Sequence, residues 1–489
     1  MGNGAWKEET LDPEDWDEMR KLGHRMLDDM IDAHQNLGSR KIAFPTEEAI
    51  KEIQTPLSED GEGTQEVYEV FLRSILPHAV ISAIPRFWAY VAGTGSTYGM
   101  LADMLASGTN LSTETLLGGK IVHNQVIEWI GELLDFPPET GGVLTHGGSE
   151  ANFTGLAVAR NAKANDDVKA RGVQCREARM TLYGSEEMHH CLERSVELLG
   201  LGNEVLRWIP TDDEYRIDLD ALRESIATDR SQGHHPFCVI GNAGTVNTGA
   251  FDDLNAVADL CEKENLWFHV DGAYGSWVKL SETHRHLADG LERADSLAVD
   301  LHKWMYMPYA IGCTLVRDRE AHFSTFVYGH QAEYLTSLLR LDENVINNPH
   351  MLALPLSRQF TSLKAYMLLR AYGKRKYCNL IQQNLDQMEY LASLIREEPK
   401  LVISAPIISN VVCFQYKVDG LEGAESDKLN EELRRRLWET HPFIISDTTL
   451  KGSYMLRACS VNHRSRKQDF KFLVNEVIRI GDELINEDA

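Results

Sequence analysis

The sequence predicts an α/β fold, with one large, mostly parallel sheet and a smaller α/β domain at the C-terminal end. Two patterns lead to this prediction. From about residue 85 to residue 320, short apolar runs alternate with stretches of helical periodicity, which is typical of a parallel sheet covered by helices. After a mostly helical stretch at residues 353–397, which Pro399 is expected to close, the alternation resumes on a smaller scale.

Short apolar runs mark the expected strands. In the large domain these runs are residues 143–145, 237–240, 266–270 and 312–316. In the C-terminal region the expected strands are residues 401–404, 411–416, 443–446 and 454–460, with a charged helix at 425–438 and a last helix from about residue 467.

The chain has 489 residues, more than one small core usually holds, so several domains are expected. We assign residues 1–84 to an N-terminal helical segment, residues 85–365 to the large domain and residues 366–489 to the small C-terminal domain. Residues 56–64 are rich in Gly, Ser and acidic side chains and are expected to form a linker.

The N-terminal segment carries a strong helix-start signal. Asp12 suits the N-cap and Pro13 suits the first helical position. Large apolar side chains then recur at helical spacing: Trp16, Met19, Met26 and Met30. This stripe is expected to dock on another surface, either of the same chain or of a second subunit with which the segment is exchanged.

Composition excludes several classes of protein. Hydrophobic residues make up 43% and charged residues 25%, and no apolar run approaches the ~18 residues of a membrane span. The first residues are polar and acidic without a signal-peptide core, so we expect a cytoplasmic protein without a membrane partner. A net charge of −25 disfavours nucleic acid as a partner. None of the eight cysteines forms a C-x-x-C pair, and no metal site is expected.

The most informative stretch joins a strand-end acid to a lysine. The apolar run 266–270 ends in Asp271, and Lys303 follows 32 residues later in His302-Lys303-Trp304. A strand-end carboxylate lies at the carboxyl edge of a parallel sheet, where such folds bind ligands. Enzymes that use pyridoxal 5′-phosphate (PLP) need a lysine for a Schiff base and an acid that keeps the pyridine nitrogen protonated. Taken singly, Asp271 could simply cap a loop and Lys303 could be a surface amine.

A second stretch has the features of a phosphate site. Residues 145–152, with Gly147, Gly148 and Ser149, follow an apolar run and open a helix. Glycines let the backbone approach a phosphate, and a helix N-terminus supplies amide donors. Glycine-rich turns also occur for purely geometric reasons. His189 follows another strand-like segment, and its neighbour His190 does not make the two a metal pair.

Together these segments resemble the group II PLP-dependent amino-acid decarboxylases, which include the aromatic-L-amino-acid, histidine and glutamate decarboxylases. The resemblance runs from about Pro85 to Asn462. Its landmarks, in order, are residues 85–90, 101–105, 147–149, His189, Thr245, residues 269–274, 300–304, 355–358, 456–457 and Asn462.

The resemblance implies a role for each matched residue. Lys303 is similar to the Schiff-base lysine, Asp271 to the partner of the pyridine nitrogen, and His189 and Ala273 to the residues on the two faces of the cofactor ring. The implied phosphate contacts are Gly147, Gly148, Ser149 and His302, and Thr245 is the implied ring-side contact.

The resemblance also implies the fold, the assembly and the reaction. The fold would be that of the PLP-dependent transferases of the aspartate-aminotransferase type (fold type I). Active sites would be shared between the subunits of a homodimer. The activity would be that of a carboxy-lyase converting an L-amino acid to a primary amine. Tyr90 and Val91 fall near the implied substrate pocket, where aromatic-amino-acid decarboxylases carry bulkier residues after the tyrosine, so the pocket wall is expected to be thinner.

One departure concerns the product. Family members that make amines resemble one another in a loop tyrosine about six residues before the Pro-Leu-x-Arg element, and this tyrosine protonates the α-carbon. Counting back from Pro355 reaches Pro349, with His350 beside it. His350 is therefore the expected substitute acid, unless the loop is gapped differently and Tyr328 or Tyr334 serves.

Four functions remain open from the sequence. The first is amine-forming decarboxylation, expected for an aromatic or otherwise bulky side chain. The second is decarboxylation coupled to oxidative deamination, which gives an aldehyde, ammonia and hydrogen peroxide, and we expect some flux to take this route. The third is another PLP lyase or a transaminase. The fourth is a binding protein without catalysis, which the retention of Lys303, Asp271 and His189 disfavours.

Overall fold

In a computed structural model, the chain forms two compact units, residues 1–84 and residues 85–489, each taken by itself below. The structure describes residues 9–40, 44–79, 82–111, 117–164, 167–175, 177–327, 348–440 and 443–487. None of the helices in these ranges is long and apolar enough to cross a membrane.

The first unit is helical over most of its described residues. Its α-helices are α1 (Trp16–Gln35), α2 (Glu47–Ile53), α3 (Thr64–Val70) and α4 (Leu76–Ala79). Residues 54–63 lie outside helices, where the linker was expected.

The start of α1 differs from the expectation. The N-cap is Asp15, because its carboxylate accepts the backbone N–H groups of Asp17 and Glu18 at 2.8 and 3.1 Å. The helix therefore begins after Pro13, and the prediction that Asp12 caps it is wrong.

The second unit is built on a seven-stranded sheet in the order β2-β8-β7-β6-β5-β3-β4. Only β8 runs antiparallel to its neighbours, so the prediction of a mostly parallel sheet is confirmed. All four apolar runs expected as strands lie in it. Its strands are β2 (Gly141–Thr145), β3 (Met180–Ser185), β4 (Leu206–Ile209), β5 (His235–Asn242), β6 (Trp267–Asp271), β7 (Ser296–Asp300) and β8 (Gly312–Val316).

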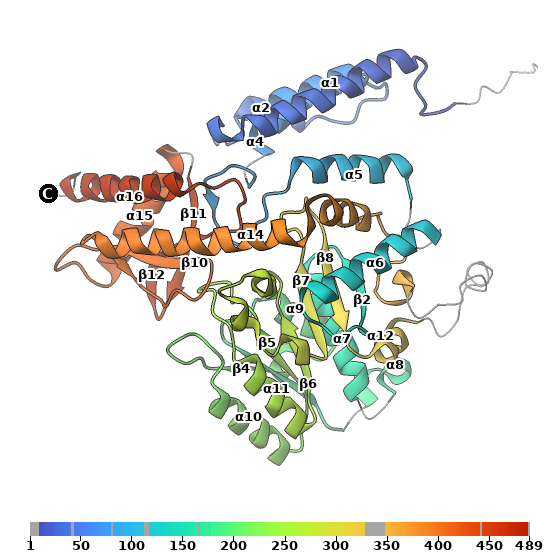
Figure 1. The fold of residues 1–489 in the computed structure, drawn as a ribbon, viewed down its shortest axis with the longest axis vertical. Coiled ribbons are helices and arrows are strands. Elements are labelled where there is room, and N and C mark those ends of the chain that lie inside the picture. Colours follow the sequence, from blue (N-terminus) through green and yellow to red (C-terminus); the bar gives the residue numbers. More distant parts are fainter. Residues whose placement is uncertain are drawn as a thin grey trace, which may run out of the picture. The chain divides into compact units, whose positions relative to one another are not determined.

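Helices cover both faces of this sheet (Figure 1). Successive residues of β5 show this, because Val239 packs in one apolar cluster with α10 and α11, whereas Cys238 and Ile240 pack in another with α7 and α9. The helices of this part are α5 (Thr97–Thr109), α6 (Leu117–Leu133), α7 (Gly148–Lys163), α8 (Val168–Arg171), α9 (Cys191–Leu198), α10 (Leu219–Ser231), α11 (Leu254–Glu264) and α12 (Arg319–Phe326).

A long helix, α14 (Ser362–Glu397), leads into the C-terminal region. It starts nine residues later than expected, beyond Pro355, and Gly373 interrupts it with a φ of 68°. It ends two residues before Pro399, as predicted.

The second sheet has five strands in the order β1-β11-β12-β10-β9, and α15 (Ala424–Thr440) and α16 (Lys467–Glu487) pack on it. The strands are β1 (Phe87–Trp88), β9 (Leu401–Ile403), β10 (Val411–Tyr416), β11 (Ile444–Leu450) and β12 (Ser453–Cys459). The unexpected member is β1, which comes from the start of this unit and pairs in parallel with β11. The Trp88 ring is fully buried and stacks on Phe470 with ring centroids 4.5 Å apart.

Candidate active site

Strand ends bring the acidic side chains of the site together. Strands β6 and β7 are parallel neighbours that end at Asp271 and Asp300, and β2 ends beside the turn that opens α7. Because these ends meet at one edge of the sheet, both carboxylates face the same cavity. Asp271 is 7% exposed and Asp300 is 1% exposed.

Backbone hydrogen bonds hold Asp271 in place. Its Oδ1 accepts the N–H of Ala273 at 3.1 Å, and its backbone carbonyl accepts the N–H of Ala243 at 2.9 Å. The carboxylate is therefore oriented before any ligand arrives, which suits a group that must meet a cationic ring nitrogen.

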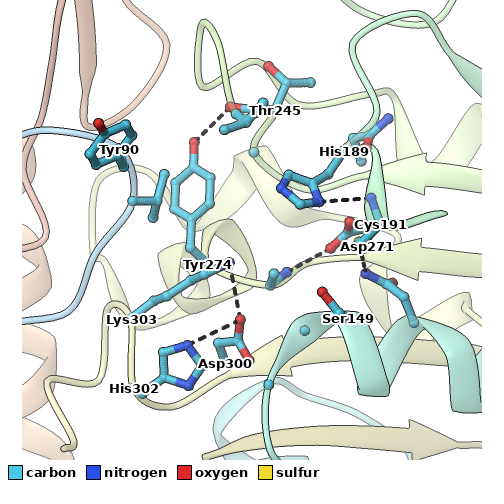
Figure 2. A pocket seen from close by; sticks show the side chains of 18 of the residues that line it. Tyr90, Ser149, His189, Cys191, Thr245, Asp271, Tyr274, Asp300, His302 and Lys303 are labelled. Atoms are coloured by element: carbon cyan, nitrogen blue, oxygen red, sulfur yellow. Dashed lines mark hydrogen bonds and ion pairs between the residues drawn. The ribbon is translucent and has the colours of Figure 1, made fainter. Parts of the chain in front are cut away.

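Lys303 follows β7 and points back toward these acids (Figure 2). Its Nζ lies 3.1 Å from Asp300 Oδ2. Burial lowers the pKa of Lys303, but the carboxylates of Asp300 and Asp271 outweigh this effect and raise the pKa above its usual value. The lysine is thus held as an ammonium beside the acids.

His189 borders the cavity from the other side. Burial and the neighbouring Lys303 and His190 lower its pKa despite the opposing effect of Asp271, so the ring is neutral near pH 7. The backbone N–H of Cys191 donates to Nδ1 at 3.2 Å, which places the ring proton on Nε2.

The turn before α7 leaves room for an anion. A side chain at Gly148 would have its Cβ 2.9 Å from Asp300 Oδ2 and 3.2 Å from the Cβ of Ala273, so only glycine keeps this space open. The amides of Gly148 and Ser149 begin the helix, where unpaired N–H groups and the helix dipole attract negative charge.

The segment around Gly93 lies very close to the loop that carries His302 and Lys303. A Cβ at Gly93 would lie 1.5 Å from the carbonyl oxygen of His302, and the Gly93 N–H donates to the Tyr309 hydroxyl at 3.0 Å. The segment that carries Tyr90 and Val91 is thereby held against the lysine loop.

All of these groups surround one cavity of about 720 Å³. Every predicted cofactor and substrate residue lines it: Tyr90, Val91, Gly147, Gly148, Ser149, His189, Thr245, Asp271, Ala273, His302 and Lys303. Thr245 is held there because its Oγ1 accepts the N–H of Ala250 and shares a hydrogen bond with the Thr248 hydroxyl.

His350 is placed differently. It lies in a short turn, Pro349–Met351, at 4% exposure, and it is not among the residues that line the cavity. The next residues, Leu352 and Ala353, pack on Val143 of β2. Tyr328 and Tyr334 lie outside the described residues. Of the loop that is expected to supply the proton donor, the structure describes only the end that contains Pro349 and His350.

The cavity also contains groups that the sequence did not single out. Asp300 had a usable signal, since it ends an apolar run at the same sheet edge as Asp271. No local signal marks Glu187 and Asn247, or Ser446, Asp447 and Arg457 from β11 and β12. Arg457 donates to the backbone carbonyls of Tyr90, Val246 and Asn247 and to Ser446 Oγ, so its guanidinium joins three segments of the cavity wall.

This set of groups suits PLP. It combines an amine for the cofactor aldehyde, a buried acid for the ring nitrogen and a glycine turn with free amides for the phosphate. Asp300 Oδ1 is a buried atom in this cavity for which the described residues supply no hydrogen-bond partner, as expected at a place where a ligand completes the site.

Comparison with known proteins agrees with this chemistry. The model of the "Pyridoxal-dependent decarboxylase conserved domain" matches residues 46–417. The chain is 30% identical over 474 residues to the aromatic-L-amino-acid decarboxylase of Bacillus atrophaeus, covering 96% of each protein. It is 27% identical over 474 residues to the phenylacetaldehyde synthase of Arabidopsis thaliana, covering 94% of each.

The fold has close structural counterparts. The crystal structure of Oryza sativa TDC with PLP and tryptamine superposes with a TM-score of 0.89 at 23% identity, covering 97% of this chain and 100% of that one. The predicted PLP-dependent transferase fold is therefore confirmed, and the cofactor is PLP. Family model, full-length relatives and fold agree, and the chain belongs to the pyridoxal-dependent decarboxylase family as a PLP-dependent amino-acid decarboxylase.

Proposed function

We propose that the enzyme removes the α-carboxylate of an L-amino acid with an aromatic or otherwise bulky side chain and releases a primary amine. The observation that carries the proposal is the convergence of Lys303, Asp271 and His189 on one cavity with the glycine turn at its edge. When bound there, PLP supplies an electron sink for the bond to the carboxylate.

The proposed roles follow from position. Lys303 would hold the cofactor through an imine, and without cofactor its ammonium lies beside Asp300. Asp271 keeps a positive charge on the ring nitrogen, and His189 and Ala273 flank the ring. The amides of Gly147, Gly148 and Ser149, together with His302, hold the phosphate, and Thr245 contacts the ring edge.

The substrate carboxylate meets little opposing charge in this cavity. Among the described lining residues, the arginine is Arg457, which is 3% exposed and whose guanidinium is bonded to backbone carbonyls. A carboxylate that is not held in an ion pair is easier to lose as carbon dioxide, because its charge disappears in the transition state. This supports decarboxylation over transamination.

The side-chain pocket supports a bulky, non-acidic substrate. Tyr90, Val91 and Tyr309 supply apolar surface, while Glu187 and Asp447 add negative charge. Acidic side chains would be repelled there. Tyr90 is 59% exposed, so a large side chain has room beside it.

The product is tested by following amine, aldehyde, oxygen uptake and peroxide together across the twenty amino acids. We expect aromatic substrates to give mainly amine, with a minor aldehyde fraction that consumes oxygen, because Pro349 has no proton to give. Pro349→Tyr should lower the aldehyde fraction. His350→Ala should raise it if His350 is the acid, and Tyr328→Phe or Tyr334→Phe should raise it if a tyrosine upstream serves instead.

Two outcomes would change this account. Amine alone, without oxygen consumed, would show that another acid protonates the α-carbon well and that the interpretation of the loop is wrong. Aldehyde alone, with peroxide in equal amount, would establish the second candidate, oxidative deamination, which the similarity to a phenylacetaldehyde synthase favours.

We also propose a homodimer with shared active sites. Large apolar side chains are exposed on both units of the single chain: Trp16, Met19 and Met26 on α1, and Met104, Leu105, Ile121, Tyr309 and Leu354 on the second unit. Light scattering should give twice the chain mass at assay concentrations. Ile121→Glu combined with Leu354→Glu should yield a folded monomer with little activity. A fully active wild-type monomer would rule out shared sites.

A further inference from the structure

Asp300 is the least exposed acid in the cavity, and it is held rigidly. Its backbone N–H donates to the carbonyl of Ala273 at 2.7 Å, and its carbonyl accepts the indole N–H of Trp277 at 2.9 Å. The side chain therefore points into the glycine turn and has little freedom to move away. A Cβ at Gly312 would lie 2.6 Å from Asp300 Oδ1, so the neighbouring backbone is also close.

The two carboxylate oxygens of Asp300 differ in their hydrogen-bond partners. Oδ2 lies 3.1 Å from Lys303 Nζ and 3.7 Å from His302 Nε2. Oδ1 is buried and receives no hydrogen bond from the described residues. A buried carboxylate oxygen that lacks a hydrogen-bond donor disfavours the charged form of the acid.

Lys303 is the main cation available to Asp300. The other titratable groups around it are His302, His189, Tyr309 and Cys313. Burial lowers the pKa of His302, more than the charge of Asp300 raises it, and the pKa of His189 is also lowered. Burial raises the pKa of Tyr309 and of the Cys313 thiol. All four groups are therefore neutral near pH 7.

Cofactor loading would weaken this ion pair and add an anion. Once Lys303 forms an imine, its nitrogen would keep at most one of the three N–H groups that the ammonium offers Asp300. The phosphate brings negative charge to the turn at Gly148, next to Asp300 Oδ2. Asp271, a second buried acid of the cavity, would meet the ring nitrogen and so would not supply a donor to Asp300. Two adjacent anions with little water between them repel strongly, and one of them is expected to take up a proton.

We propose that Asp300 is a carboxylate paired with Lys303 in the free enzyme and a protonated carboxylic acid in the loaded enzyme, where it donates a hydrogen bond to the cofactor phosphate. The inference rests on the proposed placement of the phosphate at the turn before α7. One proton is taken from solvent, the ion pair with Lys303 is given up, and no electrons are transferred. Asp300 thus couples cofactor retention to pH.

The coupling is measured by calorimetry of PLP binding to the apoenzyme in buffers of different ionisation heat, which counts the protons taken up. Wild type should take up about one proton more than Asp300→Asn, because the amide supplies an N–H donor without titrating. Asp220→Asn, a change of an exposed acid on α10, should match wild type. Equal counts in wild type and Asp300→Asn would overturn the inference.

Affinity gives a second, independent readout. Over the pH range in which the proton is lost, the affinity of wild type for PLP should fall about tenfold more per pH unit than that of Asp300→Asn. Asp300→Leu, which neither donates nor pairs, should bind PLP about tenfold or more weaker than Asp300→Asn at every pH. Parallel pH profiles for wild type and Asp300→Asn would contradict the proposal.

Failure of the inference is distinguishable from failure of the proposed function. If wild type binds PLP and shows the visible absorbance of the lysine-bound cofactor but Asp300→Asn behaves identically, only the role of Asp300 is wrong. If wild type shows no such absorbance, or if Ser149→Ala and a bulky change at Gly148 leave PLP affinity unchanged, the placement of the cofactor is wrong.

Discussion

Replacing Lys303 with alanine is expected to abolish turnover and the visible absorbance of the bound cofactor. Lys303 is the lysine in the cavity, and its Nζ lies beside Asp300 at the edge of the sheet. Without it, the cofactor has no covalent attachment and product release loses its amine. The loss of rate should be on the order of ten-thousandfold or more, equivalent to over about 5 kcal/mol in the barrier.

Two further variants separate the covalent role from other effects. Lys303→Arg keeps a cation beside Asp300 and should fold normally, yet it should be as inactive as the alanine variant because a guanidinium does not form the imine. Lys263→Ala, at an exposed position on α11, should retain full activity. A Lys303→Ala enzyme that kept both turnover and the visible absorbance would remove Lys303 from the mechanism.

Replacing Asp271 with alanine is expected to cost PLP affinity and most of the rate. The carboxylate is 7% exposed and already oriented by the N–H of Ala273. Removing one partner of a buried ion pair costs about 3–5 kcal/mol, which corresponds to a loss of about two to four orders of magnitude in rate. Cofactor titration and single-turnover kinetics measure the two losses separately.

Charge is the property under test at this position. Asp271→Glu should recover part of the activity, because the negative charge is kept although its distance from the pyridine nitrogen changes. Asp271→Asn, nearly isosteric and neutral, should stay close to the alanine variant. A near-normal rate for Asp271→Ala or Asp271→Asn would place the stabilising charge on another residue.

Local signals explain which features could be predicted. Asp271 stands at the end of an apolar run, and Gly147 and Gly148 stand between such a run and a helix, so sequence order alone indicated a sheet-edge site. The strand runs were found for the same reason, since burial on both faces requires continuous apolar sequence.

Long-range contacts explain what could not be predicted. Strand β1 has only two residues, Phe87 and Trp88, and pairs with Ile444 and Ile445 far along the chain, which no local pattern reveals. Arg457 reaches the cavity because β12 folds back onto the 245–248 loop. The helix cap at Asp15 was missed for a different reason, because Asp12 and Asp15 stand on either side of Pro13-Glu14 and only the hydrogen bonds show which of them caps the helix.

Proton transfer to the α-carbon links the proposed product to the proposed dimer. His350 is buried and does not line the cavity of its own chain, so we expect any role as the acid to depend on how subunits assemble. The product and oligomer experiments above are therefore linked. If the enzyme is a dimer that makes amine, and its His350→Ala variant makes more aldehyde, the homodimer and the role of His350 as the acid would both be supported.

The central claim is that PLP is bound covalently at Lys303. The most direct test is to reduce the holoenzyme with borohydride, digest it and locate the modified lysine by mass spectrometry. The account predicts bleaching of the visible absorbance and a phosphopyridoxyl group on Lys303 in the His302-Lys303-Trp304 peptide. A phosphopyridoxyl group on a different lysine, or none on any lysine after complete bleaching, would contradict it.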